Sequence, residues 1–104
     1  DLFAFQQKAG KPIIFLEVGW CSMANMAHEP WDYTKDEDEA ATDFDLQKRL
    51  YEAFFEAWHG RQELGGFCIW VWDPGTPASD DRGYTPKGKP AERVLREWLG
   101  KAWK

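Results

Sequence analysis

The sequence predicts an α/β fold built from two consecutive βα units. Two apolar runs, "IIFLEV" at 13–18 and "FCIWVW" at 67–72, show no alternation of polar and apolar residues, which is typical of parallel strands covered on both faces. An amphipathic stretch at about 43–59 separates them, as a crossover helix would. A long polar loop follows each run, whereas the turn from helix to strand is short. This asymmetry is typical of (β/α)8 TIM barrels.

The remaining segments fit the same order of elements. Residues 2–9 are expected to form the end of a helix with Gly10 as its C-cap, and the "GG" at 65–66 marks the turn into the second strand. Pro90 suits the first turn of a final helix, "PAERVLREWLGKAW". Two strands cannot close a barrel, which takes about 250 residues. We therefore expect the 104 residues to form one unit, the last part of an incomplete barrel.

The two helices carry apolar stripes that define the expected core. The stripe of the first helix consists of Leu46, Leu50, Phe54 and Trp58, with Ala53 and Ala57 alongside. The stripe of the final helix consists of Val94, Leu95, Trp98 and Leu99. The acidic run "KDEDEAATD" before the first helix is interpreted as a solvated flank, because negative charge favours the positive end of the helix dipole.

Composition and charge exclude several classes of protein. The net charge is −5, with 18 acidic and 13 basic residues, and the longest cationic stretch is "PKGKP", so no nucleic-acid partner is expected. No apolar run approaches the roughly 20 residues of a membrane span, so no membrane partner is expected. The first residues have no signal-peptide pattern, although a signal could lie upstream, and localisation stays open.

No metal or cofactor is expected. Cys21 and Cys68 form no CxxC motif and no metal-ligand spacing with a histidine, and two free buried cysteines are favoured over a disulfide. Asp73, Asp80 and Asp81 lack the spacing of an EF-hand loop and are interpreted as part of a solvated loop.

Glu17 stands near the end of an otherwise apolar strand. The period-two alternation of a strand puts Phe15 and Glu17 on one face and Ile14 and Leu16 on the other. We expect Glu17 to point into the barrel and Leu16 to point outward under the helices. The active sites of such barrels lie at the carboxyl ends of their strands, where Glu17 is placed. The alternative is an ordinary strand-end glutamate, exposed to water or paired with a lysine.

Four sequence blocks, "KPIIFLEVGW", "PWDY", "FCIWVWDP" and "GYTPKGKPAERVLREW", resemble the C-terminal part of glycoside hydrolase family 113, the β-mannanases of clan A. The resemblance covers nearly the whole chain. It implies that the two strands are the seventh and eighth of a TIM barrel and that Glu17 stands at the position of the nucleophile. The expected substrate is a β-linked polysaccharide, β-1,4-mannan. The family motif commonly continues Glu-x-Gly-Tyr, whereas Trp20 stands at the aromatic position here.

A retaining glycosidase needs a nucleophilic carboxylate and a second carboxylic acid about 5 Å away. The resemblance implies that this acid/base follows an asparagine, but the one asparagine of the chain, Asn25, precedes Met26. The complete protein is thus expected to be an enzyme, and this chain is expected to be inactive alone. The alternative is a non-catalytic carbohydrate-binding or barrel-completing module. The remainder of the barrel or another copy of the chain would be its protein partner.

The resemblance also suggests sugar-binding aromatic residues. Trp70 and Trp72 lie on one face of the second strand, and the C–H face of a sugar stacks well on an indole. Trp72 is expected to form the floor of the cleavage subsite, with plain packing as its alternative, and Trp70 is expected in a core layer. Trp20, Trp31 and Tyr33 in the first loop are expected either to line sugar subsites or to anchor the loop.

Overall fold

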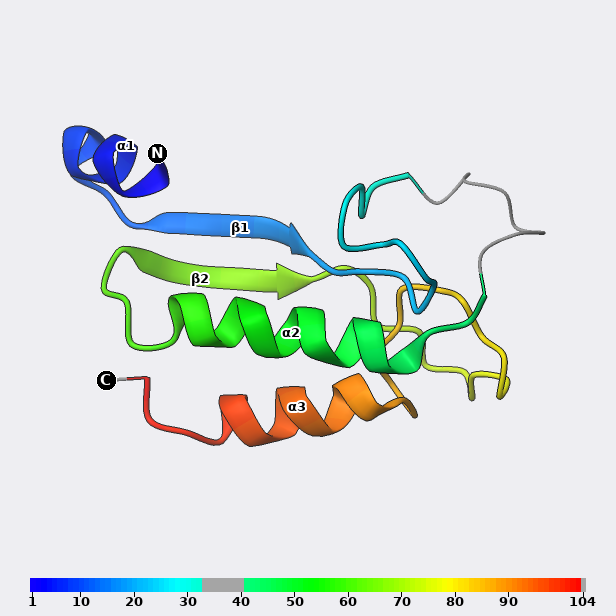
Figure 1. The fold of residues 1–104 in the computed structure, drawn as a ribbon. Coiled ribbons are helices and arrows are strands. Elements are labelled where there is room, and N and C mark those ends of the chain that lie inside the picture. The colour runs from blue at the N-terminus through cyan, green and yellow to red at the C-terminus, as the bar shows by residue number, and fades with distance from the viewer. Residues whose placement is uncertain (33–40, 104) are drawn as a thin grey trace.

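The computed structural model describes residues 1–32 and 41–103 (Figure 1). Its elements, in chain order, are α1 (Leu2–Ala9), β1 (Ile13–Val18), α2 (Phe44–Trp58), β2 (Leu64–Ile69) and α3 (Pro90–Leu99). The strands pair in parallel, and α2 and α3 lie together on one side of the sheet (Figure 1). The predicted order of elements and the parallel pairing are therefore confirmed. None of the helices in these described ranges has the length and apolar character needed to cross a membrane.

The ends of the helices follow local capping rules. Asp43 caps α2, where its side chain accepts a hydrogen bond of 2.8 Å from the backbone N–H of Leu46. Gly10 ends α1 in the left-handed conformation, with φ at 66°, as expected of a C-cap glycine. Pro90 opens α3 in the position where its missing N–H costs nothing. Part of the acidic run before Asp43 lies outside the described residues.

The second strand starts earlier than predicted. It covers residues 64–69, not 67–72, and its register places Ile13 opposite Leu64 and Val18 opposite Ile69. The two glycines expected in the turn are therefore part of the strand. Gly65 permits this, because a Cβ at that position would come within 2.8 Å of the Cβ of Pro12. Parallel pairing with β1 thus overrides the turn preference of the glycines.

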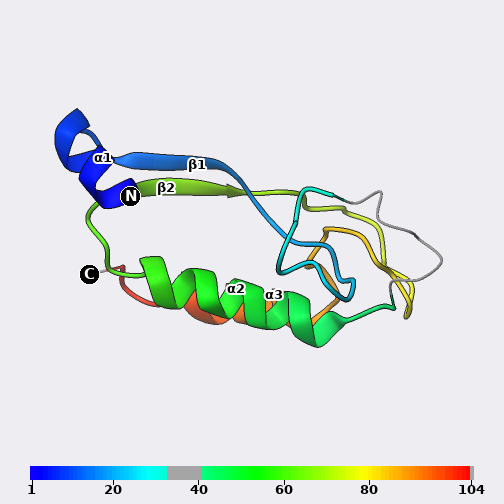
Figure 2. The same ribbon diagram turned by 45° about the horizontal axis from the view of Figure 1, so that its top comes forward.

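The sheet has one face covered by helices and one open face, as Figure 2 shows from a second direction. The ring of Phe15 packs against Phe54 and Trp58 of α2, with centroid distances of 6.1 and 5.1 Å. On the opposite face Ile14 is 60% and Leu16 76% exposed. The prediction that Leu16 points outward under the helices is therefore wrong, because Phe15 takes the helix-facing side. The open face is apolar.

The core lies between the sheet and the two helices. Its fully buried centre consists of Tyr51, Phe55, Ala91, Val94 and Leu95. Trp98 of α3 stacks on Phe55 of α2 with a centroid distance of 5.7 Å and an interplanar angle of 4°. Burial of such aromatic area supplies most of the hydrophobic stabilisation of a small unit.

Three residues of the predicted stripes are exposed: Ala53, Ala57 and Leu99. On α2 the most buried positions are Gln47, Tyr51 and Phe55, so the buried face is rotated relative to the predicted stripe. The rotation arises because α2 packs against two partners, the sheet on one side and α3 on the other. Leu99 lies at the end of α3, beyond this contact.

Candidate functional site

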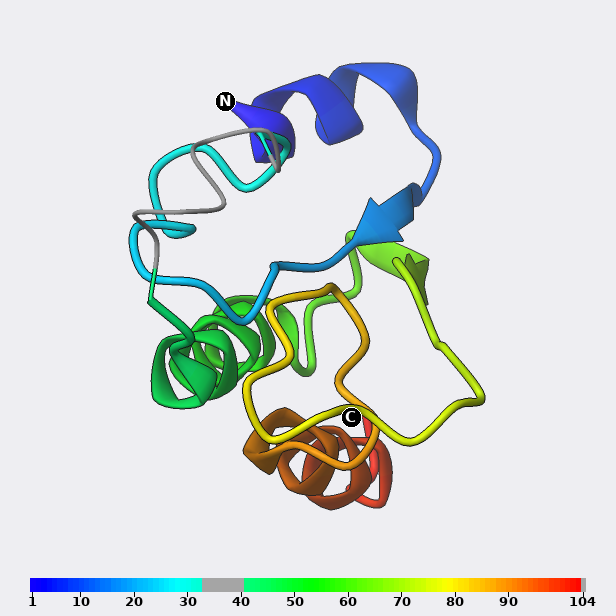
Figure 3. The same ribbon diagram turned by 90° about the vertical axis from the view of Figure 1, so that its right-hand side faces the viewer.

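The loops that follow β1 and β2 meet at the carboxyl end of the sheet (Figure 3). A hollow of about 350 Å³ lies there, lined by Glu17, Gly19, Pro30, Trp31, Trp70 and Tyr84. It brings one carboxylate from the first strand together with aromatic residues from both loops. An acidic group beside aromatic rings is suited to bind a sugar, because hydroxyl groups bond the carboxylate while the C–H face packs on a ring.

Glu17 is exposed and lies in the part of β1 where the register with β2 shifts, between Phe15 and Val18. Because the pairing is irregular here, the side chain of Glu17 need not follow the strict two-residue alternation of strand faces that the sequence predicted. Glu17 also borders a second hollow, of about 240 Å³, on the side of Trp20 and Trp58. Within the described part of the chain its carboxylate has no hydrogen-bond or ion-pair partner, so the alternative of pairing with a lysine gains no support.

Trp70, and not Trp72, lines the hollow with Glu17. Both tryptophans are partly exposed, and the peptide bond between Trp70 and Val71 is cis. The backbone N–H of Trp70 donates to the carbonyl of Val18 at 2.9 Å, which holds it beside the end of β1. Because β2 ends at Ile69, the aromatic residue at the strand terminus is Trp70 rather than one inside a core layer.

The three aromatic residues predicted in the first loop have different outcomes. Trp31 is 70% exposed and lines the hollow. Trp20 packs edge-on against Tyr51 at 5.1 Å, so its ring anchors the loop on α2 and borders the second hollow rather than the first. Tyr33 lies outside the described residues.

Gln47, which the sequence analysis missed, ties the two loops together. Its buried side-chain amide nitrogen donates to the carbonyls of Trp20 at 3.0 Å and of Tyr84 at 3.1 Å. One amide on α2 therefore fixes both loops at the edge of the hollow. The signal was present in the sequence, since Gln47 stands four residues before Tyr51, on the apolar side of the helix.

A partly buried ion pair provides a second tie between the loops. The Lys89 side chain is fully buried, and its Nζ lies 2.6 Å from Asp81 Oδ1 and 3.1 Å from both Ser22 Oγ and the Gly83 carbonyl oxygen. Burial by itself would raise the pKa of Asp81, but the Lys89 and Gly83 hydrogen bonds and the Lys89 charge outweigh it and lower the pKa. Asp81 is therefore a loop residue that is only partly solvated, with 30% of its side chain exposed, and this corrects its interpretation as a solvated residue in part.

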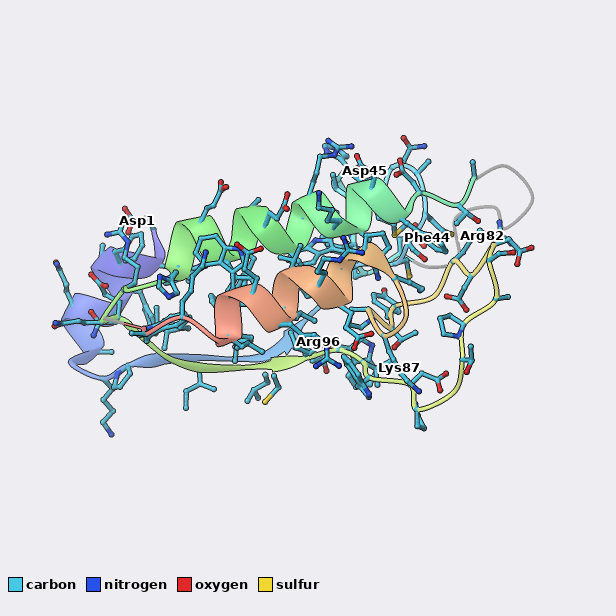
Figure 4. All side chains as sticks on the ribbon, turned by 90° about the horizontal axis from the view of Figure 1, so that it is seen from below. Asp1, Phe44, Asp45, Arg82, Lys87 and Arg96 are labelled. Atoms are coloured by element: carbon cyan, nitrogen blue, oxygen red, sulfur yellow. The ribbon has the colours of Figure 1, made fainter. Side chains whose placement is uncertain are left out.

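The loops converge at one end of the molecule. Figure 4 shows Phe44, at the start of α2, at the same end as Arg82 of the second loop. The ammonium group of Lys89 lies 5.8 Å from the centre of the Phe44 ring, a further contact between the second loop and α2. Thr42, just ahead of that helix, donates from Oγ1 to the carbonyl of Asp80 at 2.8 Å.

The two cysteines are both free, as favoured by the sequence, but only Cys21 is buried. Cys68 is exposed because it lies on the open face of β2. Among the described residues no group of three or more histidine, cysteine or acidic side chains is arranged to hold a metal ion.

Comparison with known proteins points to one family. Residues 2–89 match the sequence profile of Glycoside Hydrolase Family 113. No curated protein sequence matches the chain at a significant level.

Solved structures that resemble this chain point to the same family. The GH113 β-mannanase AaManA from Alicyclobacillus acidocaldarius, in complex with ManMIm, is 34% identical over 97% of this chain, with a TM-score of 0.81. A complex structure of a GH113 β-1,4-mannanase is 28% identical over 96% of the chain, with a TM-score of 0.80. The chain spans 33% of the length of each of these structures.

A small α/β unit with two parallel strands is consistent with part of a TIM barrel. The profile match covers most of the chain, and the solved relatives superpose on nearly all of it. The chain therefore belongs to Glycoside Hydrolase Family 113.

Proposed function

We propose that this chain is the nucleophile-bearing C-terminal part of a retaining glycoside hydrolase that acts on β-linked polysaccharide, with β-1,4-mannan as the substrate. The observation that carries the proposal is the shared hollow of Glu17 and Trp70, which come from the ends of neighbouring parallel strands. Active sites of TIM-barrel enzymes lie at this end of the strands. The β-1,4-mannanase activity of the solved relatives supports the choice of substrate.

Glu17 acts as the nucleophile in this proposal. Its carboxylate attacks the anomeric carbon, the glycosidic C–O bond breaks, and a glycosyl-enzyme ester forms. A second carboxylic acid gives its proton to the leaving oxygen and then takes a proton from the water that hydrolyses the ester. Trp70 supplies the apolar surface on which the sugar at the cleavage point rests.

The acid/base residue comes from outside the chain. Glu17 is the one carboxylate among the described residues that line the hollow. A single carboxylate cannot both form the ester and protonate the leaving group, so the 104-residue chain is inactive alone.

The remaining strands of the barrel complete the site. In this proposal β1 and β2 are the seventh and eighth strands, and their open face points to the barrel interior. Ile14 and Leu16 would then be covered by residues of the other strands, which explains why two large apolar side chains are exposed here.

The test is Glu17→Gln in the complete protein. The variant should keep its fold and bind manno-oligosaccharides, while turnover falls by at least about a thousandfold, because a neutral amide cannot form the ester. Wild-type product should retain the β-anomeric configuration by NMR. Glu56→Gln, an exposed glutamate on α2, is the matched control and should be fully active. Near-normal turnover by Glu17→Gln would remove Glu17 from the mechanism.

A non-catalytic carbohydrate-binding module is the second candidate. The strongly exposed ring of Trp31 and the single carboxylate of the hollow favour it. The complete wild-type protein would then bind β-mannan without releasing any reducing ends. Hydrolysis by the wild-type protein rejects this candidate.

A further inference from the structure

We infer that Tyr84 is a positioning residue for sugar binding: its hydroxyl, bonded to the carbonyl of Pro30, holds Trp31 as a wall of the hollow beside Glu17. The inference deepens the proposed function and rests on it, since the ligand is taken to be a β-linked oligosaccharide. Tyr84 lies in the second loop and Trp31 in the first, so the bond joins the two halves of the site.

The hydrogen bond between Tyr84 and Pro30 is short and joins residues that are far apart in the sequence. Tyr84 Oη donates to the Pro30 carbonyl oxygen at 2.7 Å, across 54 residues of chain. That carbonyl belongs to the peptide unit whose nitrogen is the backbone nitrogen of Trp31. Because a peptide unit is planar, fixing its oxygen also fixes the direction in which the chain enters Trp31. The indole is otherwise 70% exposed and needs such a support to stay in one place.

Tyr84 is itself held at both ends. Its ring packs against the buried cluster of Cys21, Met23 and Met26, and its backbone carbonyl accepts the hydrogen bond from Gln47. A donor carried on a packed ring loses little conformational entropy when it bonds, so its direction is reliable. Tyr84 therefore fixes the loop that carries Trp31 relative to this buried cluster.

The buried cluster against which Tyr84 packs includes the thiol of Cys21. Burial raises the pKa of Cys21 more than its hydrogen bond with Tyr84 lowers it, so the sulfur stays protonated near neutral pH.

The first experiment removes this hydroxyl alone. Tyr84→Phe in the complete protein should raise the KM for manno-oligosaccharides by about three- to tenfold, the effect of one lost hydrogen bond, with kcat within about twofold. Tyr51→Phe is the matched control, because the buried Tyr51 hydroxyl has no hydrogen-bond partner in the described part of the chain. It should leave KM unchanged. Equal KM values for Tyr84→Phe and wild type would overturn the inference.

A double-mutant cycle separates positioning from general weakening. If Tyr84 acts through Trp31, Tyr84→Phe should add almost nothing to the KM of a Trp31→Ala variant. A plain structural effect would raise KM by the same factor in both backgrounds, and that outcome would contradict the inference.

A third measurement does not depend on sugar. In protein labelled with ¹⁵N-tryptophan, the backbone amide signal of Trp31, identified by its loss in Trp31→Phe, should move in Tyr84→Phe and stay in place in Tyr51→Phe. An unmoved signal would refute the link between Tyr84 and Trp31. If the signal moves but the wild-type protein binds no manno-oligosaccharide, the proposed function fails, and the sugar-binding role of Trp31 fails with it.

Discussion

Gly19 and Trp70 meet backbone to backbone at the carboxyl ends of the two strands. A Cβ added at Gly19 would overlap the carbonyl oxygen of Trp70 and come within 2.9 Å of its carbonyl carbon. The N–H of the same tryptophan bonds to Val18, the residue before the glycine. The chain can bring Trp70 this close to Glu17 because residue 19 has no side chain. The glycine that follows the strand is thus part of the geometry of the site.

Gly19→Ala should destabilise the chain by about 1–3 kcal/mol, because the added methyl group forces the two backbones apart. Urea unfolding of the 104-residue chain measures the effect. Gly66→Ala is the control, since a Cβ there would meet no atom within 4 Å. Equal free energies of unfolding for the two variants would show that the contact with Trp70 is looser than described.

Trp70→Ala and Trp72→Ala should differ in the complete protein. Trp70 lines the hollow with Glu17, so its removal should lower kcat/KM for manno-oligosaccharides at least about tenfold, equivalent to about 1.4 kcal/mol. Trp72 does not line that hollow, and its replacement should cost less. A greater loss for Trp72→Ala, as the sequence alone suggested, would assign the sugar floor to Trp72 instead.

Asp81→Asn should reveal the role of the partly buried ion pair. It leaves the buried Lys89 without a counter-charge, which should cost about 2–4 kcal/mol at pH 7, reduced somewhat because the Asp81 side chain is 30% exposed. Asp80→Asn, at an exposed neighbouring position, is the control. Urea unfolding of both variants at neutral pH checks the difference.

The ion pair between Asp81 and Lys89 should also contribute to the loss of folding stability at acidic pH. Because the pKa of Asp81 is lower in the folded chain than the ordinary value of about 3.9 in the unfolded chain, the unfolded chain binds more protons in the acid range. The stability from Asp81 is therefore present above about pH 4 and is lost as the pH falls through its lowered folded value. Asp81→Asn should flatten the decline below pH 4. Equal slopes for this variant and Asp80→Asn would contradict the assignment.

The open face of the sheet should make the isolated chain associate. Ile14 and Leu16 are large exposed apolar side chains on neighbouring positions of that face. Leu16→Asp should shift light scattering of the 104-residue chain toward the monomer, whereas Leu99→Asp, an exposed leucine on α3, should not. A wild-type chain that stays monomeric at high concentration would argue against an unpartnered apolar face.

Much of the local structure could be predicted because it depends on neighbouring residues. The apolar run at 13–18 forms β1 with the predicted limits, and Asp43 and Gly10 cap their helices as their side-chain and backbone preferences dictate. The strand-then-loop order also placed Glu17 at the carboxyl end of the sheet, where it lines the hollow.

The sequence by itself thus determined the order of elements and the family, and it predicted the region of the candidate site, because these follow from local preferences and recognisable blocks. Only the tertiary structure decided the limits of β2, which side of β1 faces the helices, and that Trp70 rather than Trp72 adjoins Glu17. The tertiary structure also decided that Gln47 and Lys89 are buried. The physical reason is that strand register and loop ties are contacts between segments far apart in the chain. Their free energy outweighs the local preference of a glycine pair or a lysine.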